Sequence, residues 1–196
     1  MKSTKRIVTM AGAACCCVAV AAFSLWPAPA PATSETAADP VKTASIRPIQ
    51  RGPSGLPLPR FVSLKSDRIN VRSGPGQDYP VSWIFTRAGL PVEIVAEFDN
   101  WRRIRDSEGA EGWVYHSLLS GRRTALVTPW EKEGEPKALH AAAADSSRLV
   151  ARLASTLLLD VHECNGAWCY VTTHGHNGYI AQSDVWGVYP GELFEE

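Results

Sequence analysis

The stretch INVRSGPGQDYPVSWIF, residues 69–85, places a turn-forming cluster between two short runs of mostly alternating apolar residues. A phosphate-binding loop would instead lead into a helix and would be followed by Lys and Ser or Thr. Here Gln77 to Pro80 lead into a second strand-like run. The stretch therefore predicts two strands joined by a loop. In that loop we expect Gly74 and Gly76 to supply positive φ angles and Pro75 to stiffen the bend.

Short runs of strand length continue beyond this stretch, with turn residues between them and no ten-residue helical pattern. In the longest run, Val92, Ile94 and Ala96 are expected on one face of the strand. Glu93 and Glu97 are expected on the other face. The pattern predicts an all-β fold with strands at RFVSL (60–64), INVR (69–72), VSWIF (81–85), LPVEIVAEF (90–98), WRRIR (101–105), EGWVY (111–115) and RTALV (123–127).

The second half of the chain repeats the first. Trp101 is followed by Gly112-Trp113-Val114, and Trp168 is followed at nearly the same distance by Gly178-Tyr179-Ile180. We interpret these segments, about sixty residues each, as two tandem copies of one small β-domain. Trp113 and Tyr179 are expected to point into the two cores.

Three motifs at matching spacing carry a family resemblance. At INVRSGPG with YP, at DNWRRIR and at GWVY, the sequence resembles a bacterial SH3-like (SH3b) domain, and residues 61–127 contain all three in order. Residues 137–188 resemble the family more loosely, through CNGAWCYV and GYI. The resemblance implies two tandem small SH3-like β-barrels, a fold used to recognise peptides, cell-wall peptidoglycan or partner proteins.

The N-terminal segment has the pattern of an export signal. Basic residues in MKSTKR precede the uncharged run 7–26, and Ala30 and Ala32 form a small-residue cleavage pattern. The run also approaches the roughly 17–25 residues of a membrane-spanning helix, so an uncleaved anchor stays open. Both alternatives predict an exported protein, located in the periplasm or cell envelope or anchored in the inner membrane.

Proline content changes sharply after this segment. Residues 27–59 hold eight of the fourteen prolines and few large apolar side chains, so they are expected to stay extended and disordered. The expected organisation is a signal peptide or anchor in 1–32, a disordered Pro-rich linker in 33–59, a first SH3b domain in 60–128 and a second in 129–190.

Beyond the N-terminal segment the chain contains two cysteines, Cys164 and Cys169. Asn165-Gly166 between them is a strong hairpin-turn dipeptide, which would place the two cysteines opposite each other at a separation that suits a bridge. A zinc site would need further ligands nearby. In an exported protein the spacing predicts a disulfide, and no metal is expected.

Charge excludes several classes of partner. Residues 61–128 hold nine Lys or Arg against eight Asp or Glu, and residues 129–196 hold four against ten. No block is basic enough for nucleic acid. The acidic second half argues against docking on an anionic membrane, so we expect membrane contact through the N-terminal segment alone, if it is uncleaved.

Catalytic patterns are missing from the sequence. No G-x-S-x-G, H-E-x-x-H or phosphate loop with Lys is present. His174 and His176 supply two neighbouring imidazoles, fewer than a metal site requires, and are better explained as part of a hairpin tip. We expect no catalytic residue, no cofactor and no enzymatic activity.

Binding is the function that these observations favour. Aromatic side chains offer large contact area at low entropic cost, and polar neighbours can orient a ligand. The resulting hypothesis is a non-catalytic double module that binds peptidoglycan or an envelope protein or peptide. Alternatives are a structural protein–protein adaptor without cell-wall affinity and an accessory subunit of a cell-wall hydrolase. The expected ligand-binding residues are Arg72, Asp78, Tyr79, Trp101 and Tyr115.

Overall fold

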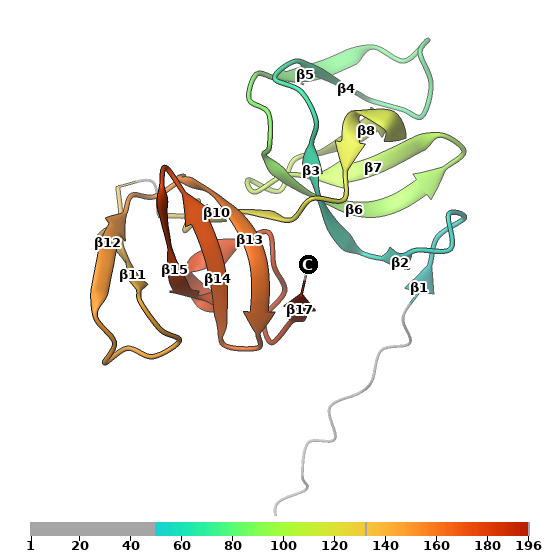
Figure 1. Ribbon diagram of the computed structural model, residues 1–196. Helices are drawn as coiled ribbons and strands as arrows, with labels where there is room; N and C mark the ends of the chain where they lie inside the picture. The colour runs from blue at the N-terminus through green and yellow to red at the C-terminus, as the bar shows by residue number, and fades with distance from the viewer. Residues whose placement is uncertain (1–49, 132, 196) are drawn as a thin grey trace, which may run out of the picture. The chain divides into compact units, whose positions relative to one another are not determined.

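The computed structural model describes residues 50–131 and 133–195. The expected signal peptide or anchor, and residues 33–49 of the expected linker, lie outside the described residues. Within the described part the fold is all-β, as predicted, with two large antiparallel sheets and the short 3₁₀ helices η1 (His116–Leu118) and η2 (Gln182–Asp184) (Figure 1). None of the described residues belongs to a helix with the length and apolar character to cross a bilayer.

The first sheet contains the strands predicted from residues 60–115. Its order is β5–β4–β8–β7–β6–β3–β9. Alternating side chains of these strands bury a core built around Ile69, Val71, Ile104 and Val114, each fully shielded from solvent. The strand bounds are β3 (Arg60–Leu64), β4 (Ile69–Arg72), β5 (Val81–Phe85), β6 (Pro91–Phe98), β7 (Trp101–Arg105), β8 (Glu111–Tyr115) and β9 (Leu119–Ser120).

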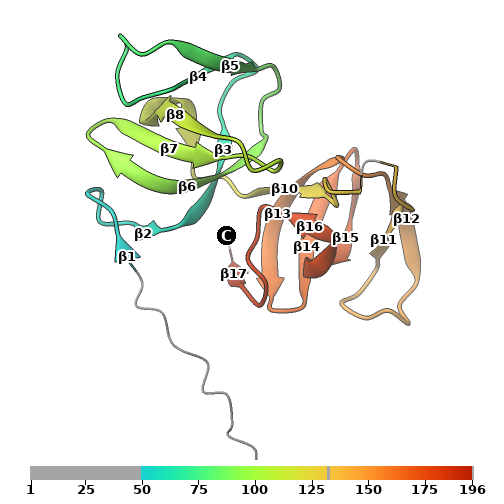
Figure 2. The ribbon, with the colours of Figure 1, turned by 180° about the vertical axis from the view of Figure 1, so that it is seen from behind.

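The second sheet repeats this topology. Its order is β12–β11–β15–β14–β13–β10–β16, and β17 pairs with β13 (Figure 2). The path β11–β15–β14–β13 corresponds to β4–β8–β7–β6, which confirms the predicted tandem repeat. The strand bounds are β10 (Thr124–Val127), β11 (Lys137–His140), β12 (Leu149–Leu153), β13 (Leu158–Asn165), β14 (Trp168–Thr173), β15 (His176–Ala181), β16 (Val185–Trp186) and β17 (Leu193–Glu195).

Strand β10 belongs to the second sheet, although the sequence predicts that residues 60–128 form the first domain. It pairs with β13 and β16, and its Ala125 and Val127 form part of the second hydrophobic core. The expected boundary is therefore wrong for this strand. Local pattern identifies a strand but does not reveal which sheet completes it, because pairing partners are distant in sequence.

The last part of the expected linker is ordered. Strands β1 (Gln50–Arg51) and β2 (Pro57–Leu58) form a two-stranded ribbon, so the prediction of disorder is wrong for residues 50–59. Glu97 holds the ribbon through Ser54. The Glu97 carboxylate accepts one hydrogen bond from the backbone nitrogen of Ser54 at 2.9 Å and another from the Ser54 hydroxyl at 2.8 Å. Leu58 packs against the first core.

A β-bulge explains how Glu97 reaches that position. Ile94 pairs with Ile104, but Ala96 pairs with Arg103, so the register shifts between Ile94 and Ala96. The extra residue turns Ala96 to the opposite face from Ile94. The expectation that Val92, Ile94 and Ala96 share one face is therefore wrong, as is the expectation that Glu93 and Glu97 share the other.

The two aromatic residues expected in the cores lie on the outer faces instead. Val114 and Ile180 are fully buried, and their neighbours Trp113 and Tyr179 are half-buried. Because successive strand residues point to opposite faces, burial of the aliphatic residue places the aromatic one outside.

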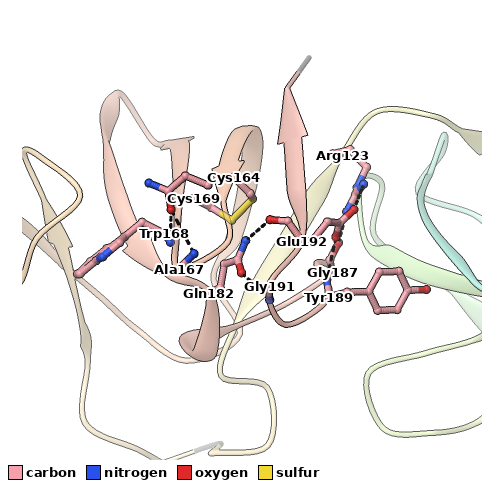
Figure 3. Close-up of a disulfide and its surroundings, with 11 residues drawn as sticks. Arg123, Cys164, Ala167, Trp168, Cys169, Gln182, Gly187, Tyr189, Gly191 and Glu192 are labelled. Atoms are coloured by element: carbon pink, nitrogen blue, oxygen red, sulfur yellow. Dashed lines mark hydrogen bonds and ion pairs between the residues drawn. A yellow bond between two sulfur atoms is a disulfide. The ribbon is translucent and has the colours of Figure 1, made fainter. Parts of the chain in front are cut away.

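Cys164 and Cys169 form the predicted disulfide (Figure 3). The two residues are paired directly across β13 and β14, with Cα atoms 4.1 Å apart. The turn between them is fixed by the side-chain oxygen of Asn165, which accepts hydrogen bonds from the backbone nitrogens of Ala167 and Trp168. Both cysteines are part of the second core.

Candidate functional site

A cleft of about 400 Å³ lies on the first sheet, and we call it the polar cleft. It is formed by β4, the loop after β4, the paired strands β7 and β8, and helix η1. Its lining residues are Arg68, Asn70, Arg72, Gln77, Trp101, Tyr115, Ser117 and Leu118.

Strand β4 supplies the polar wall of this cleft. Ile69 and Val71 are fully buried, so Asn70 and Arg72 between and after them face outward. Arg68 directly before the strand continues the same face and is exposed. The alternation that builds the core therefore also places two guanidinium groups and an amide along one side of the cleft.

The facing wall is aromatic. Trp101 and Tyr115 lie directly opposite each other in β7 and β8. Their ring centroids are 5.6 Å apart and their planes meet at 82°, an edge-to-face contact of the kind that aromatic pairs prefer. Both rings are half-buried, so they combine packing with an accessible face.

The loop after β4 is organised around Tyr79. A Cβ atom on Gly74 would lie 2.3 Å from the Tyr79 ring, and one on Gly76 would lie 3.2 Å from it. Neither glycine has a positive φ angle, so the expectation on that point is wrong: Gly74 is required by the close approach of the ring. The carbonyl oxygen of Tyr79 accepts a hydrogen bond from Arg72 at 2.6 Å, which ties the loop to the cleft.

The electrostatics of the cleft are one-sided. Its lining contains Arg68 and Arg72 and no acidic side chain. Among the described residues, no carboxylate forms an ion pair with either arginine. A planar carboxylate is the natural partner of an unpaired guanidinium, and an aromatic face suits an apolar chain or the apolar face of a sugar. The arrangement is suited to recognition and contains no nucleophile–base pair.

The structure brings together three of the five predicted ligand-binding residues, namely Arg72, Trp101 and Tyr115. Tyr79 is exposed and does not line the cleft, and its carbonyl oxygen accepts a hydrogen bond from Arg72, which does. Asp78 is exposed and does not line the cleft. That these residues bind a ligand stays a prediction.

Sequence reasoning missed the other lining residues, Arg68, Asn70, Gln77, Ser117 and Leu118. For two of them the signal was available, because Arg68 and Asn70 alternate with the apolar residues of INVR on the same face as Arg72. Gln77, Ser117 and Leu118 come from a loop and a 3₁₀ helix, whose positions no period predicts.

The corresponding face of the second sheet is different. His140 pairs with Tyr179 where Arg72 pairs with Trp113 in the first sheet. Likewise Trp168 pairs with Ala181, at the position where Trp101 pairs with Tyr115. The second repeat therefore keeps one tryptophan of the site but has histidine in place of an arginine, and alanine in place of a tyrosine.

The histidines of the second repeat lie at a hairpin tip. His174 and His176 are exposed at the turn between β14 and β15. Within residues 50–131 and 133–195, no three or more His, Cys, Asp or Glu side chains are grouped in a way that would hold a metal ion.

Comparison with known proteins identifies both repeats. The family model of the bacterial SH3 domain matches residues 65–121 and again residues 133–187. No catalytic domain is matched in the chain, and no curated protein gives a significant match.

Two solved structures show distant likeness. NlpC2 from Trichomonas vaginalis has 9% identity and a TM-score of 0.31, over 65% of this chain and 48% of that one. NlpC1 from the same organism has 10% identity and a TM-score of 0.30, over 65% and 45%. The chain thus spans about half the length of the solved chains that it matches.

Proposed function

The chain belongs to the bacterial SH3 domain family, and from that premise we propose that it is an exported, non-catalytic module that binds the cell envelope through the polar cleft of its first domain. Bacterial SH3 domains typically bind cell-wall ligands. The observation that carries the proposal is the pairing of Arg68 and Arg72 with the Trp101–Tyr115 wall in one cleft without acidic lining.

The ligand class follows from this chemistry. Peptidoglycan stem peptides carry carboxylates, and the attached sugars have apolar faces that stack on aromatic rings. The two guanidinium groups would bind the carboxylate, and Trp101 and Tyr115 would contact the adjoining sugar or side chain. Export is proposed from the basic and uncharged N-terminal pattern, which also leaves membrane anchoring open.

Co-sedimentation with purified peptidoglycan sacculi tests the proposal. The full chain is expected in the pellet at low salt, with less bound as salt rises, because the contact is partly electrostatic. Arg68→Ser should reduce the bound fraction several-fold, because it removes one of the two guanidinium groups that line the cleft. Arg68 is exposed, so the substitution leaves the core intact. Arg148→Ser is the matched control, because it removes one exposed positive charge from the second repeat.

Two results would refute the proposal. One is that the protein remains in the supernatant at low salt. The other is that Arg68→Ser and Arg148→Ser reduce binding equally, since binding would then depend on overall charge and not on the cleft.

A protein–protein adaptor is the second candidate function. It is favoured by the second repeat, in which His140 and Ala181 replace the arginine and tyrosine of the polar cleft while the fold is kept. A chain that fails to sediment with sacculi but captures one envelope protein after cross-linking in cells would support this alternative.

A further inference from the structure

A second and larger cleft, of about 870 Å³, shares no lining residue with the polar cleft. We call it the ribbon cleft, because the β1–β2 ribbon forms one side of it. The first sheet, residues 121 and 123 of the segment between β9 and β10, and the segment that ends in β17 form the rest. Much of its wall is apolar, from Leu56, Leu58, Phe61, Leu119 and Phe194.

The ribbon cleft has an excess of positive charge. Arg60 and Arg102 both line it, and both are paired with the single carboxylate of Glu97, at 2.7 and 3.2 Å. Arg123 is paired with Glu192, whose carboxylate accepts hydrogen bonds from both terminal nitrogens of the Arg123 guanidinium (Figure 3). One carboxylate thus serves two guanidinium groups, and an anionic ligand would complement the remaining charge.

Strand β17, whose Phe194 contributes to the cleft wall, also has an edge without a partner strand among the described residues. Strand β17 pairs with β13 along one edge, and no other described strand pairs with it. Its Phe194 lines the cleft, and the ring is held in place by the guanidinium of Arg123, 4.7 Å from the ring centroid. A free strand edge is a template on which an extended peptide can add main-chain hydrogen bonds.

We propose that the ribbon cleft binds an extended peptide with apolar side chains and one free carboxylate. The peptide would add to the open edge of β17 and place its apolar side chains against Leu56 and Phe194. Its carboxylate would lie beside Arg60 and Arg102. This site is independent of the polar cleft and of sacculus binding.

The probe is the peptide acetyl-Val-Thr-Val-Leu with a free C-terminal carboxylate, titrated calorimetrically into the full chain. Its β-branched residues favour the extended conformation. The same peptide with a C-terminal amide keeps the apolar surface and loses the charge. We expect the amide to bind at least about tenfold more weakly, the usual cost of losing a charge-assisted hydrogen bond.

Variants locate the site. Leu56→Glu puts a negative charge on the cleft wall at a half-exposed position and should weaken binding of the carboxylate peptide about tenfold. Leu149→Glu is the matched control, since Leu149 is similarly exposed, lies on β12 and does not line the cleft. Phe194→Ala should weaken the binding of both peptides, because it removes an apolar contact and leaves the charged groups of the cleft in place.

Each opposing result overturns the proposal. Equal affinity for the two peptides would show that Arg60 and Arg102 do not bind the peptide carboxylate. If Leu56→Glu and Leu149→Glu change the affinity equally, the peptide does not bind in the ribbon cleft. Absence of binding at millimolar peptide rejects the ligand class. If Arg68→Ser abolishes binding while Leu56→Glu does not, the peptide occupies the polar cleft instead.

Discussion

The hydroxyl of Tyr189 donates a hydrogen bond to a carboxylate oxygen of Glu93, 2.9 Å away, although the two residues are 96 positions apart in the chain. The other oxygen of Glu93 accepts from Arg105 at 2.6 Å. The ring of Tyr189 also packs on Phe61, with centroids 4.7 Å apart. A residue near the end of the second repeat is thus bonded to strand β6 of the first.

Removing this bond should cost stability. Tyr189→Phe deletes the donor and leaves a buried oxygen of Glu93 without it, so we expect the free energy of unfolding to fall by about 1–2 kcal/mol. Urea denaturation of the full chain measures this change. Tyr170→Phe is the control, because the Tyr170 hydroxyl meets Asn177 at an exposed position. Equal losses for the two variants would show that the bond to Glu93 contributes no more than an exposed hydrogen bond does.

The same tyrosine predicts an alkaline response. Burial, and then the hydrogen bond to Glu93, raise the pKa of Tyr189 far above its ordinary value of 10.0. A folded-state pKa above the unfolded one gives stability that is present below the unfolded pKa and is lost as pH rises above it. The free energy of unfolding should therefore decline above about pH 10. In Tyr189→Phe that decline should be shallower, and an unchanged slope would contradict the assignment.

Glu97 predicts an acid response in the ribbon. Burial alone would raise its pKa, but hydrogen bonds from Ser54 and Arg60 and the charge of Arg102 outweigh burial and lower the pKa below 4.5. A lowered folded-state pKa gives stability that is present above the unfolded pKa and is lost as pH falls. The protection factors of the amide hydrogens in residues 50–58, which account for the slower intrinsic exchange in acid, should fall as the medium is acidified below about pH 5.

Substitution at Glu97 tests the same contact at neutral pH. Glu97→Gln leaves two largely buried guanidinium groups without a counter-charge and should cost about 3 kcal/mol. It should also raise exchange in residues 50–58 at pH 7. Glu111→Gln is the control, because Glu111 pairs with the exposed Arg103 and should change stability by less than about 1 kcal/mol.

The disulfide should stabilise the second repeat moderately. Cys164 and Cys169 close a short loop, so the chain-entropy model predicts a loss of about 2 kcal/mol when both are changed to alanine. Thermal unfolding measures the loss. Mass spectrometry of the unreduced peptide that contains both cysteines should show a mass two hydrogens below the reduced form, and the full reduced mass would exclude the bond.

The two tyrosines near the polar cleft should behave differently. Tyr115→Ala removes part of the aromatic wall and should weaken sacculus binding at least about tenfold, with a stability loss near 1 kcal/mol. Tyr79→Ala removes a ring that packs on Gly74 outside the cleft, so hydrogen exchange in the 73–80 loop should rise and binding should fall less. A larger binding loss for Tyr79→Ala would place its ring in the site.

Much of the first repeat could be predicted because its signals are local. The run INVR alternates in burial as its letters do, and the strands that contain INVR and EGWVY begin and end where the turn residues indicate. Alternation also put Arg72 on the outer face of its strand. The same alternation, extended along the strand, also predicts that Arg68 and Asn70 share that face and line the cleft.

Three of the errors arose where a distant partner decides the outcome. Ala96 lies on the opposite face from the one expected, because the pairing of β6 with β7 contains a bulge. Residues 50–59 became ordered because Glu97, far along the chain, binds Ser54. Strand β10 joined the second sheet because its partners lie in β13 and β16. None of these contacts leaves a periodic mark in the sequence.

The sequence by itself determined the all-β class, the tandem repeat and the disulfide, because side-chain period and turn chemistry act over a few residues. Only the tertiary structure decided that Arg72, Trp101 and Tyr115 line one cleft, and that Arg60 and Arg102 share Glu97 in another. These groups come from different strands, and their convergence depends on register and sheet curvature, which nonlocal pairing fixes.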